Sequence, residues 1–324
     1  MDVHQYPLKT GITRTPEFER KGLAAFAVNV GTKCGHGCKY CSSGALLRMH
    51  PSFKAAGRSP FEDGFAIIDP DTPARVARDA RRLRRRGLVQ LCTTVDAWAP
   101  EAQEHNLGRR CLEAILREPG WSVRILTKNA AVTNDYDLIE RYRDRVLVAL
   151  SLTATPDNAD IMAVLEPQAS PIRERVAALR AAHARGLRTY GMLCPLLPGI
   201  ADNPAHIDEL VRLVVECGAE ELFVEPVNAR GPGLRHTQET LLAHGFPQQA
   251  AAIARIRNVA GWSVYVADLL ANVQRSVRAN YDITKLRYLL YPSRLTPAAA
   301  ARVRASDAGV VWLGRDDRRH PEGS

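Results

Sequence analysis

Three closely spaced cysteines are the residues of this chain best suited to chemistry. Cys34, Cys38 and Cys41 follow one another at spacings of four and three residues. Gly35 and Gly37 allow the positive φ or tight backbone that a loop wrapped around a metal centre requires. The three thiols can therefore converge on one point, and thiolates are ligands for zinc or for an iron–sulfur cluster.

The two metal alternatives need different numbers of ligands. A structural zinc ion takes four, so His36 inside the loop or His50 beyond it would have to supply the fourth. Three cysteines alone fit a 4Fe-4S cluster that leaves one iron open, because ferredoxin-type clusters have a full set of cysteine ligands. The cysteine spacing is compatible with either a zinc ion or a 4Fe-4S cluster.

The other four of the seven cysteines need a separate account. A chain with an odd number of cysteines and no secretion signal is not expected to contain a disulfide framework. Cys111 and Cys217 lie in helical patterns, where we expect core residues. Cys92 and Cys194 end apolar runs that have the character of strands.

Six apolar runs alternate with amphipathic segments and predict the elements that position these residues. The runs are nearly continuous in hydrophobicity, which is typical of parallel strands buried on both faces. They span residues 23–30, 88–93, 121–127, 146–152, 188–194 and 221–227. Six strands fall short of the eight in a closed barrel. The predicted fold class is therefore α/β, a partial (β/α)6 TIM-like barrel with a C-terminal extension.

Helical patterns occupy the connections. Residues 207–214 have apolar side chains at i, i+3, i+4 and i+7, and residues 172–179 form another stripe with Ser170 as N-cap and Pro171 in the first position. Beyond residue 260 we expect one more strand over 262–267 and a helix over 273–290. The predicted parts are an N-terminal extension (1–22), the barrel (23–258) and a C-terminal extension (259–324) whose polar end, 315–324, is frayed.

Ligands of such sheets bind beyond the carboxyl ends of the strands. Polar residues follow the predicted strands there, at 92–96, 127–129, 151–153, 194–195 and 225–228. We therefore expect the functional site at this edge. Glu225 and Asn228 are candidates to hold a ribose or substrate, and Arg230 to hold a phosphate or carboxylate, unless it forms a salt bridge within its loop.

Composition and charge exclude several classes of protein. With 46% hydrophobic and 24% charged residues, the chain is neither disordered nor a collagen-like fibre nor a coiled-coil rod. No stretch approaches the roughly 18 apolar residues of a membrane span, and we expect a cytoplasmic protein without membrane association. Much of the +9 net charge lies in the arginines of residues 75–86. Such a run indicates either a nucleic-acid-binding face or a solvated helix face.

The pattern C-x3-C-x2-C, with an aromatic residue before the last cysteine, resembles the signature of the radical S-adenosylmethionine (radical SAM) superfamily. Here it reads Cys34-Gly-His-Gly-Cys38-Lys-Tyr40-Cys41. The resemblance implies a 4Fe-4S cluster on the three cysteines, whose open iron chelates S-adenosyl-L-methionine (SAM). It also implies reductive cleavage of SAM to a 5′-deoxyadenosyl radical that abstracts hydrogen, with flavodoxin or ferredoxin as the usual electron donor.

Segments 125–128, 148–151, 165–171 and 194–200 resemble the DNA-repair-photolyase-like branch of that superfamily, which includes spore photoproduct lyase. The resemblance implies roles for individual residues. Lys128 would contact the SAM carboxylate with help from Ser151, Tyr40 would pack near the adenine, and Thr94 and Asp96 would lie near the methionyl amine. Helix capping is the competing role for Asp96.

Two thiols at strand ends are candidates for the hydrogen-atom donor that quenches a product radical in spore photoproduct lyase. Cys92 corresponds to that donor if the segments are aligned by cysteine, and Cys194 is its rival. The predicted function is hydrogen abstraction from a nucleobase-containing substrate, DNA or a nucleoside. The alternatives are a small natural-product precursor or peptide as substrate, and a non-catalytic zinc or iron–sulfur protein that binds nucleic acid.

Overall fold

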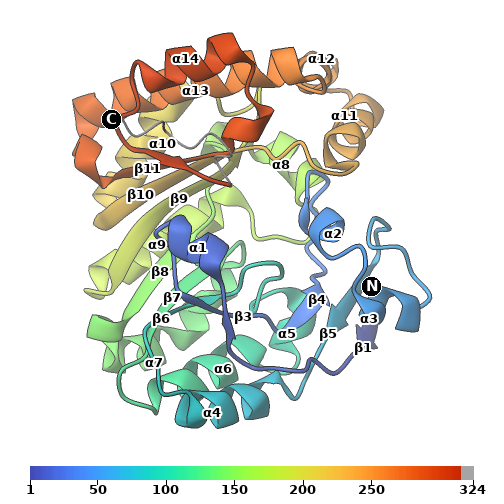
Figure 1. Cartoon of the computed structure of the whole chain (residues 1–324), viewed down its shortest axis with the longest axis vertical. Coiled ribbons are helices and arrows are strands. Elements are labelled where there is room, and N and C mark those ends of the chain that lie inside the picture. The colour runs from blue at the N-terminus through green and yellow to red at the C-terminus, as the bar shows by residue number, and fades with distance from the viewer. Residues whose placement is uncertain (315–324) are drawn as a thin grey trace, which may run out of the picture.

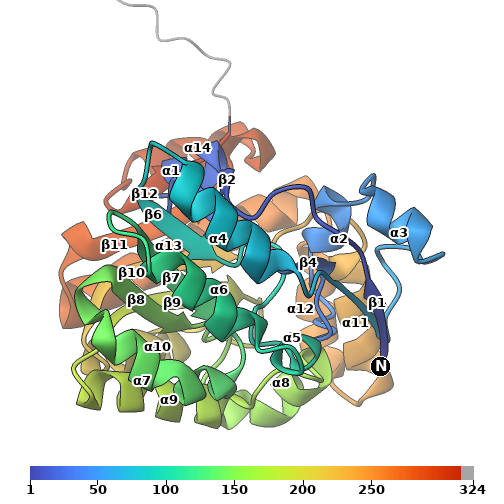
Figure 2. The same cartoon turned by 90° about the horizontal axis from the view of Figure 1, so that it is seen from below.

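The computed structural model describes residues 1–314, in which a nine-stranded sheet curves into an open, partial barrel (Figures 1 and 2). The strand order is β12-β11-β10-β9-β8-β7-β6-β3-β2, and all neighbours are parallel except β2 and β3. The strands are β2 (Thr13–Arg14), β3 (Phe26–Val28), β6 (Leu88–Leu91), β7 (Ser122–Thr127), β8 (Val146–Leu150), β9 (Arg188–Leu196), β10 (Ala219–Pro226), β11 (Leu286–Leu290) and β12 (Val310–Trp312).

The six predicted strands are present as β3 and β6 to β10, but the prediction for the C-terminal segment is wrong. Residues 262–267 lie within helix α13 (Val259–Asn280), and the helix predicted over 273–290 ends at Asn280, before β11 begins. Buried residues of α13 recur every three or four positions, which is the period of a helix. They include Trp262, Val266, Leu270, Val273 and Val277.

Most of the longer helices cover the outer face of the sheet (Figures 1 and 2). The two predicted helices are α9 (Ile172–Ala184) and α10 (Pro204–Glu216), but Ser170 is not the N-cap of α9. Its hydroxyl accepts a hydrogen bond from the Ala130 amide, and Pro171 is the capping residue. The other helices are α1 (Pro16–Arg20), α2 (Ser43–Leu46), α3 (Pro51–Ala55), α4 (Thr72–Arg82), α5 (Pro100–Gln103), α6 (Leu107–Leu116), α7 (Tyr136–Arg141), α8 (Ala159–Leu165), α11 (Gly233–Ala243), α12 (Pro247–Arg255) and α14 (Pro297–Arg304).

Side chains of the central strands alternate between two cores. In β8, Leu147 and Ala149 belong to the cluster inside the barrel, whereas Val146, Val148 and Leu150 pack under the helices. Because the strand is buried on both faces, its sequence reads as one continuous apolar run. Polar residues such as Ser151 and Thr153 follow directly after this strand, at the end where the site is expected.

A separate three-stranded sheet of order β1-β5-β4 carries the cysteine loop. Its strands are β1 (Asp2–Gln5), β4 (Gly31–Lys33) and β5 (Phe65–Ile68). The loop therefore starts from β4, which ends directly before Cys34, and not from barrel strand β3. A Cβ on Gly31 would lie 2.1 Å from the carbonyl oxygen of Ile67, so β4 approaches β5 this closely only with glycine there.

Both flanking segments join the main sheet, residues 1–22 through β2 and the C-terminal segment through β11 and β12. The boundaries at 22 and 258 stay predictions, and the expected frayed end, 315–324, lies outside the described residues. In residues 1–314, no helix combines the length and apolar character needed to cross a membrane.

Candidate functional site

A cavity opens at the carboxyl ends of the barrel strands, with an empty volume of about 1330 Å³ including the part open to solvent. All of the site residues predicted from the sequence line it. They are Cys34, Cys38, Tyr40, Cys41, Cys92, Thr94, Asp96, Lys128, Ser151, Cys194, Glu225 and Asn228. The fold thus brings the cysteine loop and the strand ends together, while the role of each residue stays a prediction.

Hydrogen bonds from the backbone fix the cysteine loop. The Gly35 amide donates to Oε1 of the buried Glu101 at 2.8 Å, and the Lys39 amide donates to the Leu165 carbonyl at 3.0 Å. Gly37 has a φ of +66°, in the left-handed region that favours glycine. The loop is therefore held by hydrogen bonds at Gly35 and Lys39, and Gly37 between them allows its turn.

The chemistry of the three thiols fits a soft cationic centre. Burial raises the pKa of Cys38 to about 12. Burial, together with the neighbouring thiols of Cys41 and Cys38, raises the pKa of Cys34 well above its usual value. Thiolates in this loop therefore need positive charge beside them, and an iron–sulfur cluster supplies it.

No three His, Cys, Asp or Glu side chains of residues 1–314 are gathered closely enough to hold one metal ion. Cysteines that bind separate irons of a cluster lie further apart than the ligands of a single ion. Of the histidines considered as zinc ligands, His50 caps α3, because its Nδ1 accepts from the Ser52 amide at 3.3 Å. His36 is buried, and its Nδ1 lies 3.6 Å from Oδ2 of Asp96.

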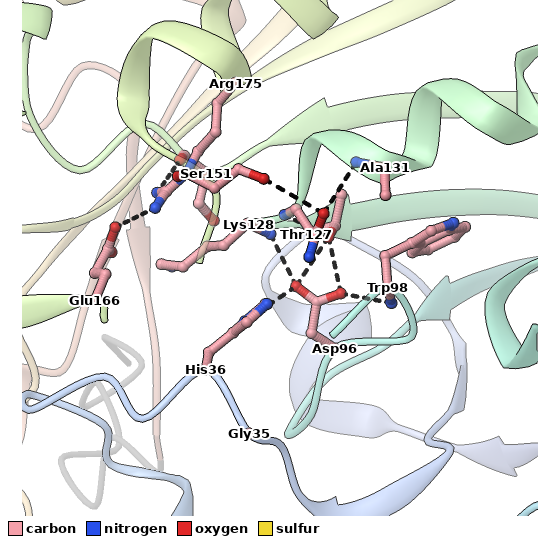
Figure 3. Close-up of polar contacts among 12 residues, drawn as sticks. Gly35, His36, Asp96, Trp98, Thr127, Lys128, Ala131, Ser151, Glu166 and Arg175 are labelled. Atoms are coloured by element: carbon pink, nitrogen blue, oxygen red, sulfur yellow. Dashed lines mark hydrogen bonds and ion pairs between the residues drawn. The ribbon is translucent and has the colours of Figure 1, made fainter. Parts of the chain in front are cut away.

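Asp96 connects the ends of two neighbouring strands beside the loop (Figure 3). Its carboxylate accepts hydrogen bonds from the Trp98 amide at 2.9 Å, the Thr127 hydroxyl at 2.8 and 2.9 Å, and the Lys128 amide at 2.8 Å. With His36 also beside it, both carboxylate oxygens already have donors from the protein. This arrangement suits a residue that positions Lys128.

Lys128 extends its ammonium group toward the cavity. Nζ donates to the Cys194 carbonyl at 3.3 Å and lies 5.9 Å from the centroid of the Tyr40 ring. It forms no ion pair with a carboxylate in the part of the chain that the structure describes. An unpaired ammonium in a cavity is suited to bind an anionic group of a ligand.

A buried network supports Tyr40 and the loop from behind. Glu166 accepts hydrogen bonds from Arg175, from the Tyr40 hydroxyl and, at 3.1 Å, from the Thr153 hydroxyl. Arg175 also donates to the Ser151 carbonyl at 3.1 Å (Figure 3). Burial by itself would raise the pKa of Glu166, but the charges of Arg175 and Lys128 and the hydrogen bonds from Arg175 and Tyr40 together outweigh it and lower that pKa. The carboxylate therefore stays ionised and holds Tyr40 in place.

The opposite side of the cavity contains a charged residue that the sequence did not point to. Lys21 Nζ lies 3.5 Å from Oε1 of Glu225, and the Cys194 thiol donates to Oε2 of Glu225 at 3.5 Å. Burial lowers the pKa of Lys21, but the Glu225 carboxylate, together with the weaker contributions of Tyr291, Cys194 and Glu17, more than compensates and raises it. No motif surrounds Lys21, and only the turn after α1 brings it to the cavity.

Both candidate donor thiols keep their protons in this environment. Burial raises the pKa of Cys92, and burial and the Glu225 carboxylate raise that of Cys194. The segment after Cys92 is fixed by Asn29, a further residue missed in the sequence, whose Oδ1 accepts from the amides of Thr93 at 2.9 Å and Thr94 at 3.0 Å. The remaining two cysteines, Cys111 and Cys217, are buried in the core as predicted.

The arginine run of residues 75–86 lies away from the site. Helix α4 packs against α6 on the outer face of the sheet. Several arginines of the run are engaged in ion pairs, including Arg75 with Asp69 at 2.8 Å and Arg86, beyond the end of α4, with Glu118 at 3.7 Å. None of them is among the described residues that line the cavity. This placement favours a solvated helix face over a substrate groove.

Two relatives of known sequence align with this chain over about two thirds of their own length. The protein ORF301 of Acidianus two-tailed virus is 23% identical over 220 residues, which cover 67% of this chain and 71% of that protein. The protein Rv2578c of Mycobacterium tuberculosis is 24% identical over 231 residues, which cover 70% of this chain and 66% of that protein.

A solved structure of spore photoproduct lyase complexed with dinucleoside spore photoproduct is similar in fold. Its TM-score is 0.59 at 15% identity, over 86% of this chain and 79% of that one. The family model of the radical SAM superfamily matches residues 28–214, more than half of the chain and including all three loop cysteines. The chain therefore belongs to the radical SAM superfamily and is a radical SAM enzyme.

Proposed function

We propose that this enzyme holds a 4Fe-4S cluster on Cys34, Cys38 and Cys41, binds SAM in the same cavity, and abstracts hydrogen from a nucleobase-containing substrate. One observation carries the proposal: thiols of a single loop and polar ends of several strands line one cavity. When bound, the cluster and SAM supply a one-electron cleavage whose product, a 5′-deoxyadenosyl radical, removes a hydrogen atom.

The chain's own residues would orient SAM through charge and position. Lys128 would pair with its carboxylate, because the ammonium group is free of other carboxylates and charge-assisted hydrogen bonds are the stronger ones. The hydroxyls of Ser151 and Thr94 line the same cavity and can add polar contacts. Asp96 would act by fixing the Lys128 backbone, and Tyr40, fixed by Glu166, would flank the adenine.

Either protonated thiol in the cavity can return a hydrogen atom to a substrate radical. Cys194 has its S–H directed to Glu225, and Lys21 neutralises that carboxylate from the other side. Cys92 lies deeper, at the end of β6. Glu225 and Asn228 are then placed to contact substrate or the ribose of SAM.

A nucleobase-containing substrate is supported by the fold shared with a lyase whose structure was solved in complex with dinucleoside spore photoproduct. The mouth of the cavity adds an aromatic ring and a cation, with the Arg230 guanidinium 4.8 Å from the centroid of the Tyr291 ring. A ring and a guanidinium are the groups on which bases stack. A small natural-product precursor or a peptide would have to enter the same cavity.

Anaerobic reconstitution tests the proposal. We expect about four irons per chain and, with dithionite or reduced flavodoxin or ferredoxin, SAM-dependent release of 5′-deoxyadenosine. Cys38→Ala should lose the visible absorbance of the cluster, whereas Cys217→Ala, a buried cysteine outside the cavity, should keep it. Bound zinc without SAM cleavage would contradict the proposal and favour a non-catalytic protein that binds nucleic acid.

A further inference from the structure

Two arginines stand together on the C-terminal side of the cavity mouth. Arg230, in the loop after β10, lines both the main cavity and a smaller adjoining cavity of about 290 Å³. Arg294, just before α14, lines the smaller cavity. The two spaces share further lining residues, among them Asn228 and Tyr291. Arg230 and Arg294 therefore both line the smaller cavity, and Arg230 also lines the main one.

Neither guanidinium has an acidic partner. In residues 1–314, Arg230 and Arg294 form no ion pair and no side-chain hydrogen bond, so the loop salt bridge considered for Arg230 is not made. Burial and the positive charge of Arg230 lower the pKa of Arg294. Like charges that share a partly buried space repel one another, and a bound anion would relieve that repulsion.

The carboxylates nearby are already engaged. Glu225 contacts Lys21 and the Cys194 thiol, and Glu17 accepts a 2.5 Å hydrogen bond from the Tyr291 hydroxyl. Neither is within ion-pair distance of the arginines. Among residues 1–314 the chain therefore provides no counterion for this pair, and the cavity is the place from which an anionic ligand would reach it.

We propose that Arg230 and Arg294 bind a phosphate group of the substrate, so that the substrate is a nucleotide, free or within a DNA strand, and not a neutral nucleoside. The inference rests on the proposed function and names the substrate class of the same site. Planar guanidinium groups match phosphate oxygens in pairs. The loop is set for this contact, because the Arg230 amide donates to Oδ1 of Asn228 at 2.9 Å.

The test compares probes with and without phosphate. The reconstituted enzyme with SAM is titrated with the four 2′-deoxynucleosides, their 5′-monophosphates, and a ten-nucleotide single-stranded DNA of mixed sequence. We expect at least one phosphate-bearing probe to bind at least tenfold more tightly than every nucleoside, about 1.4 kcal/mol. Tighter binding of a 5′-monophosphate would identify a free nucleotide as the substrate, and tighter binding of the DNA would identify a strand.

The double variant Arg230→Gln/Arg294→Gln should remove that preference. Arg82→Gln/Arg84→Gln, which changes the net charge equally on exposed positions of and just after α4, should leave it intact. Equal affinity for nucleosides and phosphate probes in the wild type, or equal loss in both double variants, would overturn the inference. Release of 5′-deoxyadenosine by the wild type is scored separately, so the inference can fail while the proposed function stands.

Discussion

The cavity has two walls with opposite chemistry. We call the side formed by the cysteine loop and Asp96, with Glu101, Glu166 and Arg175 behind it, the loop wall. The side formed by Lys21, Cys194, Glu225 and Arg230, with Arg294 in the adjoining smaller cavity, is the terminal wall. On the loop wall, Asp96 and Glu166 accept hydrogen bonds from several donors of the protein. On the terminal wall, the contacts of Glu225 are 3.5 Å long and the two arginines have no partner among residues 1–314.

The difference separates what the protein completes by itself from what a ligand must complete. Fully satisfied buried networks are rigid and fix one geometry, which suits a wall that holds the cofactors shared by a whole family. Charges without partners are tolerated beside a cavity because water or a ligand can reach them. The terminal wall is therefore where we expect substrate specificity to be set.

The largest loss of unfolding free energy is expected from replacing Glu166, which supports the loop wall. Glu166→Gln leaves the buried Arg175 without its counterion, and such a change costs about 3–5 kcal/mol of unfolding free energy. Urea unfolding under anaerobic conditions measures it. Glu216→Gln, in an exposed pair with Arg180, is the matched control and should change stability by less than about 0.5 kcal/mol. A small loss of unfolding free energy in Glu166→Gln would show that the loop wall is less rigid than its hydrogen bonds indicate.

An intermediate effect on the unfolding free energy is expected from Glu101. Unlike Asp96 and Glu166, this carboxyl group of the loop wall is not fully hydrogen-bonded within the described residues. Its Oε2 has no partner among the described residues, and burial raises its pKa from 4.5 to about 7. Between these pH values the folded chain keeps a proton that the unfolded chain releases, so stability falls as pH rises. The fall attributable to Glu101 is about 3 kcal/mol from pH 4.5 to 8.

Glu101→Gln should remove this part of the pH dependence, whereas Glu104→Gln, an exposed neighbour in the chain, should retain it. Unfolding free energies of all three proteins at several pH values between 5 and 8 provide the comparison. Parallel pH profiles for the wild type and Glu101→Gln would show that the carboxyl is ionised in the folded chain throughout, against the expectation.

The smallest loss of unfolding free energy is expected from a substitution on the terminal wall. Lys21→Met leaves Glu225 without its cation, but the Glu225 side chain is 16% exposed to the cavity and can be hydrated. We expect a loss of about 1–2 kcal/mol, the usual range for an unpaired group that is not fully buried. Thermal or urea unfolding checks it. A loss as large as that of Glu166→Gln would mean that the two walls do not differ in the way described.

Local pattern was sufficient for much of the fold. The six barrel strands could be predicted because burial on both faces makes each of them an uninterrupted apolar run. The cysteine loop was recognisable because its three thiols and two glycines lie within eight residues of sequence. In the C-terminal segment the pattern misled, because α13 has buried residues along so much of its length that its start has no clear polar face.

The sequence by itself determined the cysteine loop, the family it resembles and the strand ends that line the cavity, because each depends on residues that are neighbours in the chain. Only the tertiary structure decided which charges matter. It placed the arginines of α4 outside the site, brought Lys21 to the same cavity as Arg230, and put Arg294 beside Arg230 in the smaller adjoining cavity. Electrostatic interactions depend on distance in space and on burial, and neither follows from the positions of residues in the sequence.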